Sequence, residues 1–233
     1  MGARLFLRSL SRCGAPVGLL LSIGLLPAAL PASAQTYRPE FQPGSLKGPP
    51  HGLPNEVLVL GTPHLSNLPE SFTPKLLAPL LDRLAAWRPT AVATEDLTGL
   101  QCDSLRRYPS RYSVTVKDYC FDPAAAGAAT GLSVQEANAE AERLLAAWPS
   151  AASPGERRRL AAIWLAAGEP GSALVQWLRL PPEERKAGDG LTDVLVGTLE
   201  KVRTRKNETY LIAAALAARL GLERVWSVDD HSA

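Results

Sequence analysis

The stretch from Glu56 to Thr94, EVLVLGTPHLSNLPESFTPKLLAPLLDRLAAWRPTAVAT, decides the expected fold class. It opens on a short apolar, β-branched run at 56–60 that is typical of a buried strand. Leucines then recur at helical spacing over 74–87, and Pro89 stops that helix. A second short strand, AVAT, follows at 91–94. Strand, helix and strand within about 40 residues predict a βαβ unit, in which parallel strands are joined by a right-handed crossover.

Downstream of this unit the chain is expected to be mostly helical. Residues 95–129 show no clear period and are expected to be irregular, whereas 133–220 has the pattern of four helices. Ser133, followed three residues later by Glu136, predicts a capping box at the first of them. A third strand is expected at 224–228, RVWSV. The predicted fold is therefore α/β, a short, mostly parallel sheet with a βαβ start and a large helical insertion at about 133–220.

The first 34 residues have the three parts of an export signal. Three arginines are their only charges, an apolar stretch follows at 14–30, and small residues at 32–34 suit a signal peptidase. The apolar stretch is short for a membrane span, and a cleavage site follows it at once. We therefore expect a signal peptide cleaved before Gln35, a periplasmic or secreted protein, and no membrane anchor after cleavage.

Cleavage changes the charge of the chain. It removes three of the 25 Lys and Arg and none of the 23 Asp and Glu, which takes the net charge from +2 to −1. This balance gives no indication of a nucleic-acid partner. Residues 35–54 are rich in Pro and Gly and are expected to form a linker, and 55–233 form the α/β domain.

Only two cysteines, Cys102 and Cys120, remain after cleavage. In an oxidising compartment such a pair favours a disulfide, which by closing this loop would stabilise the fold by roughly 3 kcal/mol. The alternative is a metal-binding or redox pair, but the spacing is not CxxC.

Chemically capable side chains follow each of the three expected strands. In parallel α/β sheets, active sites lie beyond the carboxyl ends of the strands. His64 follows the first strand, Glu95 the second, and Asp229 and His231 the third. His64 and Glu95 could act as catalytic bases, and all four could bind a metal ion. The alternative is that they are solvated side chains or helix caps.

At these residues the chain resembles a known group. LVLGTPHL at 58–65, the strand ending at Glu95, and the segments 153–185 and 207–231 are similar to an uncharacterised bacterial family, a domain of unknown function. That family is related to the erythromycin esterases, the TIKI/TraB-like metalloproteases and the ChaN-like haem-binding lipoproteins. The resemblance implies an α/β fold, with a site built on the GxxH histidine, His64, and on Glu95, and with a divalent metal ion.

The chain departs from the wider group at its C-terminus. Members usually carry a second histidine motif after a later strand, whereas this sequence stops at Ala233, just past the third strand. We therefore expect the domain to be incomplete at its C-terminus. His231 could take the place of the second histidine.

These observations lead to one main functional expectation and two alternatives. The first is a metal-dependent hydrolase that cleaves an ester or amide bond of a small-molecule or peptide substrate. The second is a non-catalytic periplasmic protein that binds haem or another small ligand through His64. The third is an interaction module that presents its Ala- and Leu-rich helices to a partner, although such stripes are more typical of a core.

Overall fold

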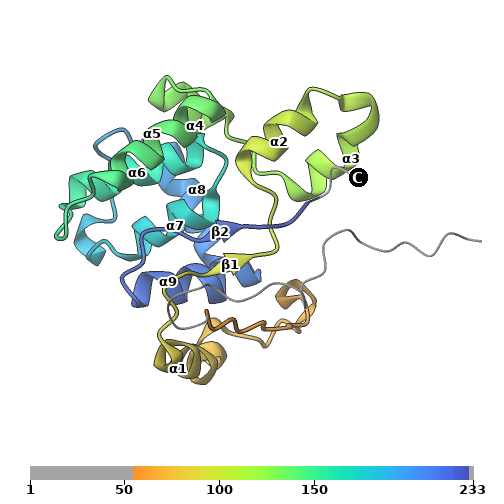
Figure 1. The fold of residues 1–233 in the computed structure, drawn as a ribbon, viewed down its shortest axis with the longest axis vertical. Coiled ribbons are helices and arrows are strands. Elements are labelled where there is room, and N and C mark those ends of the chain that lie inside the picture. Colours follow the sequence, from red (N-terminus) through yellow and green to blue (C-terminus); the bar gives the residue numbers. More distant parts are fainter. Residues whose placement is uncertain (1–54, 231–233) are drawn as a thin grey trace, which may run out of the picture. The chain divides into compact units, whose positions relative to one another are not determined.

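The computed structural model describes residues 55–230 (Figure 1). The chain divides into two compact units, residues 1–58 and 59–233. Of the first unit, residues 55–58 are described, and they form no helix or strand. The predicted signal peptide and linker lie outside the described residues. The second unit is treated by itself below.

The second unit contains a short parallel sheet. Strand β1 (Ala93–Thr94) pairs with β2 (Trp226–Ser227), and Ala93 lies opposite Trp226. The Trp226 N–H donates to the Val92 carbonyl oxygen at 2.9 Å, and the Val228 N–H to the Thr94 carbonyl oxygen at 3.0 Å. The helices α2 to α9 lie between these strands in sequence. The described part of the chain is therefore mostly helical, with one two-stranded parallel sheet. The second and third predicted strands are confirmed as β1 and β2.

The first predicted strand, at 56–60, is wrong. These residues form no strand, and the side chains of Val57 and Val59 are 81% and 89% exposed. An apolar, β-branched run favours a strand only where another strand and a packed face receive it. The predicted helix at 74–87 is confirmed as a 3-10 turn, η3 (Pro74–Leu77), that leads into α1 (Ala78–Trp87). The βαβ start is thus reduced to its helix and second strand.

The irregular region expected at 95–129 is also wrong. It contains α2 (Gly99–Arg106), α3 (Pro109–Tyr119) and α4 (Ala124–Thr130). Local signals start two of these helices, because Thr98 caps α2 by accepting from the Gln101 N–H at 3.0 Å and α3 begins at a proline. The helices α2 and α3 are short and largely polar, and α4 is a short run of alanines, so none of the three shows a clear hydrophobic period.

Two central helices, α6 (Pro154–Ala166) and α7 (Pro170–Leu178), form the main core. Every residue from Leu160 to Ala167 is buried, because the second half of α6 is apolar on all sides. Capping boxes begin both α5 and α6, the former at Ser133 as predicted. The remaining elements of the helical region are α5 (Val134–Ala146), η4 (Pro182–Glu184), α8 (Asp193–Thr204), the π-helix η5 (Thr209–Ala214) and α9 (Ala215–Arg219).

A second apolar cluster positions the segment that follows His64. Leu65, which belongs to a 3-10 turn, η2 (Leu65–Asn67), is buried together with Leu77 and Leu84. These side chains pack against a face of η5 and α9 that includes Leu211 and Leu216. Burial of the Leu65 side chain therefore fixes the backbone next to His64.

The predicted disulfide is present between Cys102 and Cys120. It joins α2 to the residue that ends α3. Within residues 55–230, no helix is long and apolar enough to cross a membrane. The disulfide is consistent with an oxidising compartment, and the signal peptide itself remains a prediction.

Candidate functional site

The carboxyl ends of the two strands lie side by side, as predicted. Beyond the paired residues, the Asp229 N–H donates to the Asp96 carbonyl oxygen at 3.1 Å. Glu95 follows β1 directly and is exposed. The structure therefore brings together the segments that carry Glu95 and Asp229, whereas His64 follows residues that form no strand and lies beside Glu208.

His64 faces a carboxylate that sequence analysis did not single out. Its Nδ1 atom lies 3.5 Å from Oε1 of Glu208, and its side chain is 74% exposed. The same Glu208 oxygen accepts a hydrogen bond from the Leu65 N–H at 2.8 Å. Because the backbone N–H of a buried residue holds this carboxylate, Glu208 lies where it can orient the imidazole ring.

Glu208 belongs to a short polar segment between α8 and η5 that fastens the loop after His64. The Lys206 Nζ donates to the Pro69 carbonyl oxygen at 3.0 Å and lies 5.9 Å from the centre of the Phe72 ring. In the sequence, residues 203–208 are charged and polar (RTRKNE), a pattern more typical of a solvated helix face than of a site. The helix is interrupted at this segment, between α8 and η5. The interruption allows Lys206 and Glu208 to contact the loop that follows His64.

The polar contacts continue from Glu208 to the end of β1. Thr209 donates a short hydrogen bond from Oγ1 to Oδ2 of Asp96. Burial, together with the negative charge of Asp96, raises the pKa of Tyr210 to about 12. We call His64, Asp96, Glu208 and Thr209 the strand-end cluster, since this connected set lies at the carboxyl edge of the sheet.

A buried carboxylate, Glu169, lies behind the strand-end cluster. Its side chain accepts hydrogen bonds from the Gly99 N–H at 2.8 Å and from the Ser227 hydroxyl at 2.9 Å. Burial raises the pKa of this carboxyl despite these two hydrogen bonds, and the charge of Asp96 adds to the rise. Both Glu169 oxygens have partners from the protein, so this residue joins the start of α2 to β2 rather than facing a substrate.

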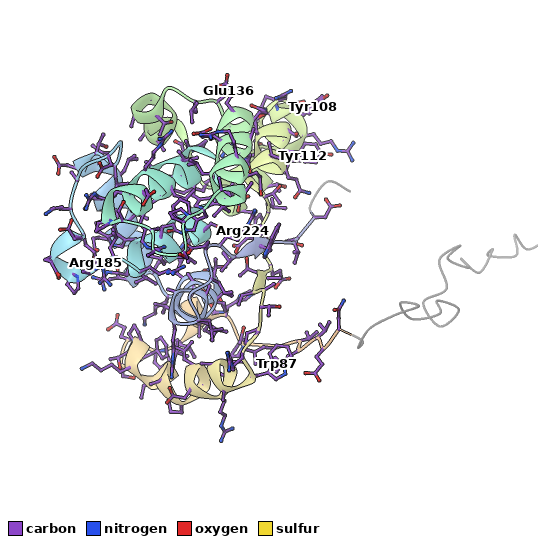
Figure 2. The ribbon with its side chains drawn as sticks, turned by 60° about the vertical axis from the view of Figure 1, so that its left-hand side comes forward. Trp87, Tyr108, Tyr112, Glu136, Arg185 and Arg224 are labelled. Atoms are coloured by element: carbon purple, nitrogen blue, oxygen red, sulfur yellow. A yellow bond between two sulfur atoms is a disulfide. The ribbon has the colours of Figure 1, made fainter. Side chains whose placement is uncertain are left out.

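An arginine counters the negative charge in this region. Arg224, labelled in Figure 2, precedes β2, and its guanidinium lies 3.7 Å from the centre of the Trp226 ring and 4.7 Å from that of Trp164. It also pairs with Glu142. With both faces and its charge engaged, Arg224 is a structural residue of the sheet edge.

The chain matches no protein-family model, no curated protein and no solved structure. The resemblance to the erythromycin esterase group therefore stays a prediction.

The predicted metal ligands have different outcomes. Among residues 55–230, no three His, Cys, Asp or Glu side chains form a group that could hold a metal ion. Asp229 lies at the sheet edge, Glu95 is exposed beside it, and His231 lies outside the described residues. What the described residues do assemble is one imidazole with an anchored carboxylate, which suits proton transfer.

Proposed function

We propose that this protein is a hydrolase of ester or amide bonds that uses His64 as its general base. The observation that carries the proposal is the position of Nδ1 of His64, 3.5 Å from Oε1 of Glu208. The proposed role uses the tautomer with its proton on Nδ1, the nitrogen that faces Glu208, so that the Nε2 lone pair is free to accept a proton. In the proposed step, Nε2 takes a proton from water as the water oxygen attacks the substrate carbonyl carbon, and the carbonyl π electrons move to the carbonyl oxygen. As the carbonyl re-forms, the C–O or C–N bond breaks, and the imidazolium returns its proton to the leaving alkoxide or amine.

The resemblance implies a divalent metal ion, whereas the proposed step uses only protein side chains and water. A structural or catalytic zinc site takes three or four ligands from the protein, and the described residues contain no group of three His, Cys, Asp or Glu side chains that could hold a metal ion. For this reason, no metal ion takes part in the proposed step. Metal analysis of the purified mature protein tests the predicted ion directly.

Substitutions at His64 and Glu208 test the proposal. Against p-nitrophenyl acetate and peptide p-nitroanilides, we expect His64→Ala to lower kcat/KM at least about 100-fold, since general bases contribute about 10²- to 10⁴-fold. Glu208→Gln keeps an oxygen that can accept from the Leu65 N–H but loses the charge that faces His64. We therefore expect a smaller loss of about 10-fold without a change in the thermal unfolding temperature.

The chain offers a matched control in His51, which lies outside the described residues. His51→Ala should hydrolyse both substrates at the wild-type rate, and Glu95→Gln tests the predicted role of that carboxylate. Full activity in His64→Ala, or no hydrolysis of any substrate by the wild type, rejects the proposal. A shift of the Soret band on addition of haem, lost in His64→Ala, would instead favour the binding protein.

A further inference from the structure

Helices α2 and α3 form a hairpin with a small apolar cluster of its own (Figure 1). The buried members of this cluster are Leu97, Cys102 and Leu105. The partly buried side chains of Tyr112, Val116 and Cys120 pack against them. The main core contains none of these six side chains. The packing of α3 can therefore change without a cavity forming in the main core.

The two helices of the hairpin are fastened very differently. The first turn of α2 is tied to distant parts of the fold, since the Gly99 N–H donates to Glu169 and the Gln101 side chain to Asp230. Asp103 in the second turn accepts from Gln135 of α5. These contacts connect α2 to three other segments of the fold: the residue before α7, the residues after β2, and α5.

Helix α3 has α2 as its main packing partner. None of its residues is buried, and α2 is the element of the described chain against which it packs. The covalent connection to α2 is the Cys102–Cys120 disulfide, and Arg106 of α2 donates a hydrogen bond to the Phe121 carbonyl oxygen just beyond α3. Figure 2 shows Tyr108 and Tyr112 at this hairpin, where Tyr108 is exposed.

We propose that the Cys102–Cys120 disulfide is a redox-sensitive fastener, whose reduction releases α3 while α2 and the main core stay folded. The small cluster then contains two thiols in place of a covalent bond, and an eleven-residue helix without buried residues is too short to persist alone. The anchored α2 has no such dependence. The inference concerns the hairpin and does not rest on the proposed hydrolase activity.

The geometry also indicates which sulfur a reductant reaches. Cys102 is 3% exposed, whereas Cys120 at the end of α3 is only partly buried. A thiolate of a dithiol would attack Sγ of Cys120, form a mixed disulfide and displace the Cys102 thiolate. The second thiol of the reductant then closes its own disulfide and displaces the Cys120 thiolate. Two electrons pass to the protein, both thiolates take up protons, and the dithiol is oxidised to a cyclic disulfide.

Limited trypsin digestion of the mature protein tests the proposal, with and without prior treatment by dithiothreitol. Arg111 and Lys117 are exposed within α3 and provide the sites to follow, while Arg143 of α5 and Arg159 of α6 are exposed internal controls. After reduction we expect cleavage after Arg111 or Lys117 to become at least ten times faster. Cleavage after Arg143 and Arg159 should not change.

A variant separates the bond from the reagent. Cys102→Ser combined with Cys120→Ser should show the fast cleavage of α3 without dithiothreitol and should not respond to it. Unchanged cleavage of α3 after complete reduction, confirmed by the gain of two hydrogens in the intact mass, would overturn the proposal. A parallel rise of cleavage after Arg143 and Arg159 would overturn it too, because it would show that the whole fold depends on the bond.

Discussion

Glu169 links pH to stability through a single buried carboxyl. Its pKa in the folded protein lies above the ordinary value of 4.5, chiefly because of burial. A carboxyl with a raised folded pKa gives its full contribution to stability below the ordinary pKa and loses it as the pH rises through the folded pKa. Glu169→Gln cannot titrate, so the free energy of unfolding of the wild type, relative to this variant, should fall as the pH is raised from about 4 to 8. Urea unfolding followed by tryptophan fluorescence measures this difference.

Glu136 provides the control of opposite sign. Hydrogen bonds from the side chain and backbone of Ser133 lower the pKa of this exposed carboxyl. Its contribution to stability is present above the ordinary pKa and is lost as the pH falls through the folded pKa. The wild type relative to Glu136→Gln should therefore lose stability only on acidification. Equal pH dependence of the wild type and Glu169→Gln above pH 5 would contradict the assignment at Glu169.

Sequence analysis identified some residues of the candidate site and missed others for a physical reason. His64, Glu95 and Asp229 follow expected strands, and a local pattern suffices to mark them. Glu208 and Glu169 owe their roles to the Leu65 N–H and the Gly99 N–H, which lie 143 and 70 residues away along the chain. Hydrophobic period and turn signals act over a few residues, so they carry no information about such contacts.

At the scale of elements, the start of α2 fits against the turn between α6 and α7 because Gly99 has no side chain. A methyl group on Gly99 would lie 1.7 Å from the Ala167 carbonyl oxygen, and the Cα of Gly168 is also in contact. Because both obstacles are backbone atoms, Gly99→Ala must displace α2. We expect it to lower the free energy of unfolding by about 3 kcal/mol, measured by urea unfolding.

The matched control lies in α8. A methyl group on Gly197 would meet no atom within 4 Å. Gly197→Ala should therefore raise the free energy of unfolding by about 0.5–1 kcal/mol through helix propensity. A Gly99→Ala protein as stable as the wild type would show that the α2 contact is not as close as described.

Elements with strong local start and stop signals were predicted well, and those that depend on a distant partner were not. The capping box at Ser133 and the helix that ends before Pro89 are local, and both are confirmed. A strand at 56–60 needs a neighbour to complete its hydrogen bonds, and a run of apolar residues does not specify one. The two strands that do form are those whose pairing is supported by Ser172 of α7, which bonds to Val225 beside β2.

At the scale of the whole molecule, the sheet joins the two ends of the helical region that runs from α2 to α9. β1 and β2 are separated by more than a hundred residues, which contain the helices from α2 to α9. The strand-end cluster therefore depends on the helical region being folded, because Asp96 precedes that region and Thr209, which bonds to Asp96, lies near its end. Sequence analysis captured this architecture, a helical insertion between strands, but placed its start about thirty residues too late.

The compartment in which the protein folds determines the redox state of its two cysteines, Cys102 and Cys120. When the full chain is expressed with its signal in a Gram-negative bacterial host, we expect the periplasmic fraction to contain protein that begins at Gln35, as read by N-terminal sequencing. Its Cys102 and Cys120 should resist alkylation by iodoacetamide until a reductant is added, since the disulfide forms in an oxidising compartment. Ala34→Leu, which places a bulky side chain at the cleavage site, should keep the signal attached. Cytoplasmic protein that retains residues 1–34 and reacts with iodoacetamide at both cysteines would contradict export.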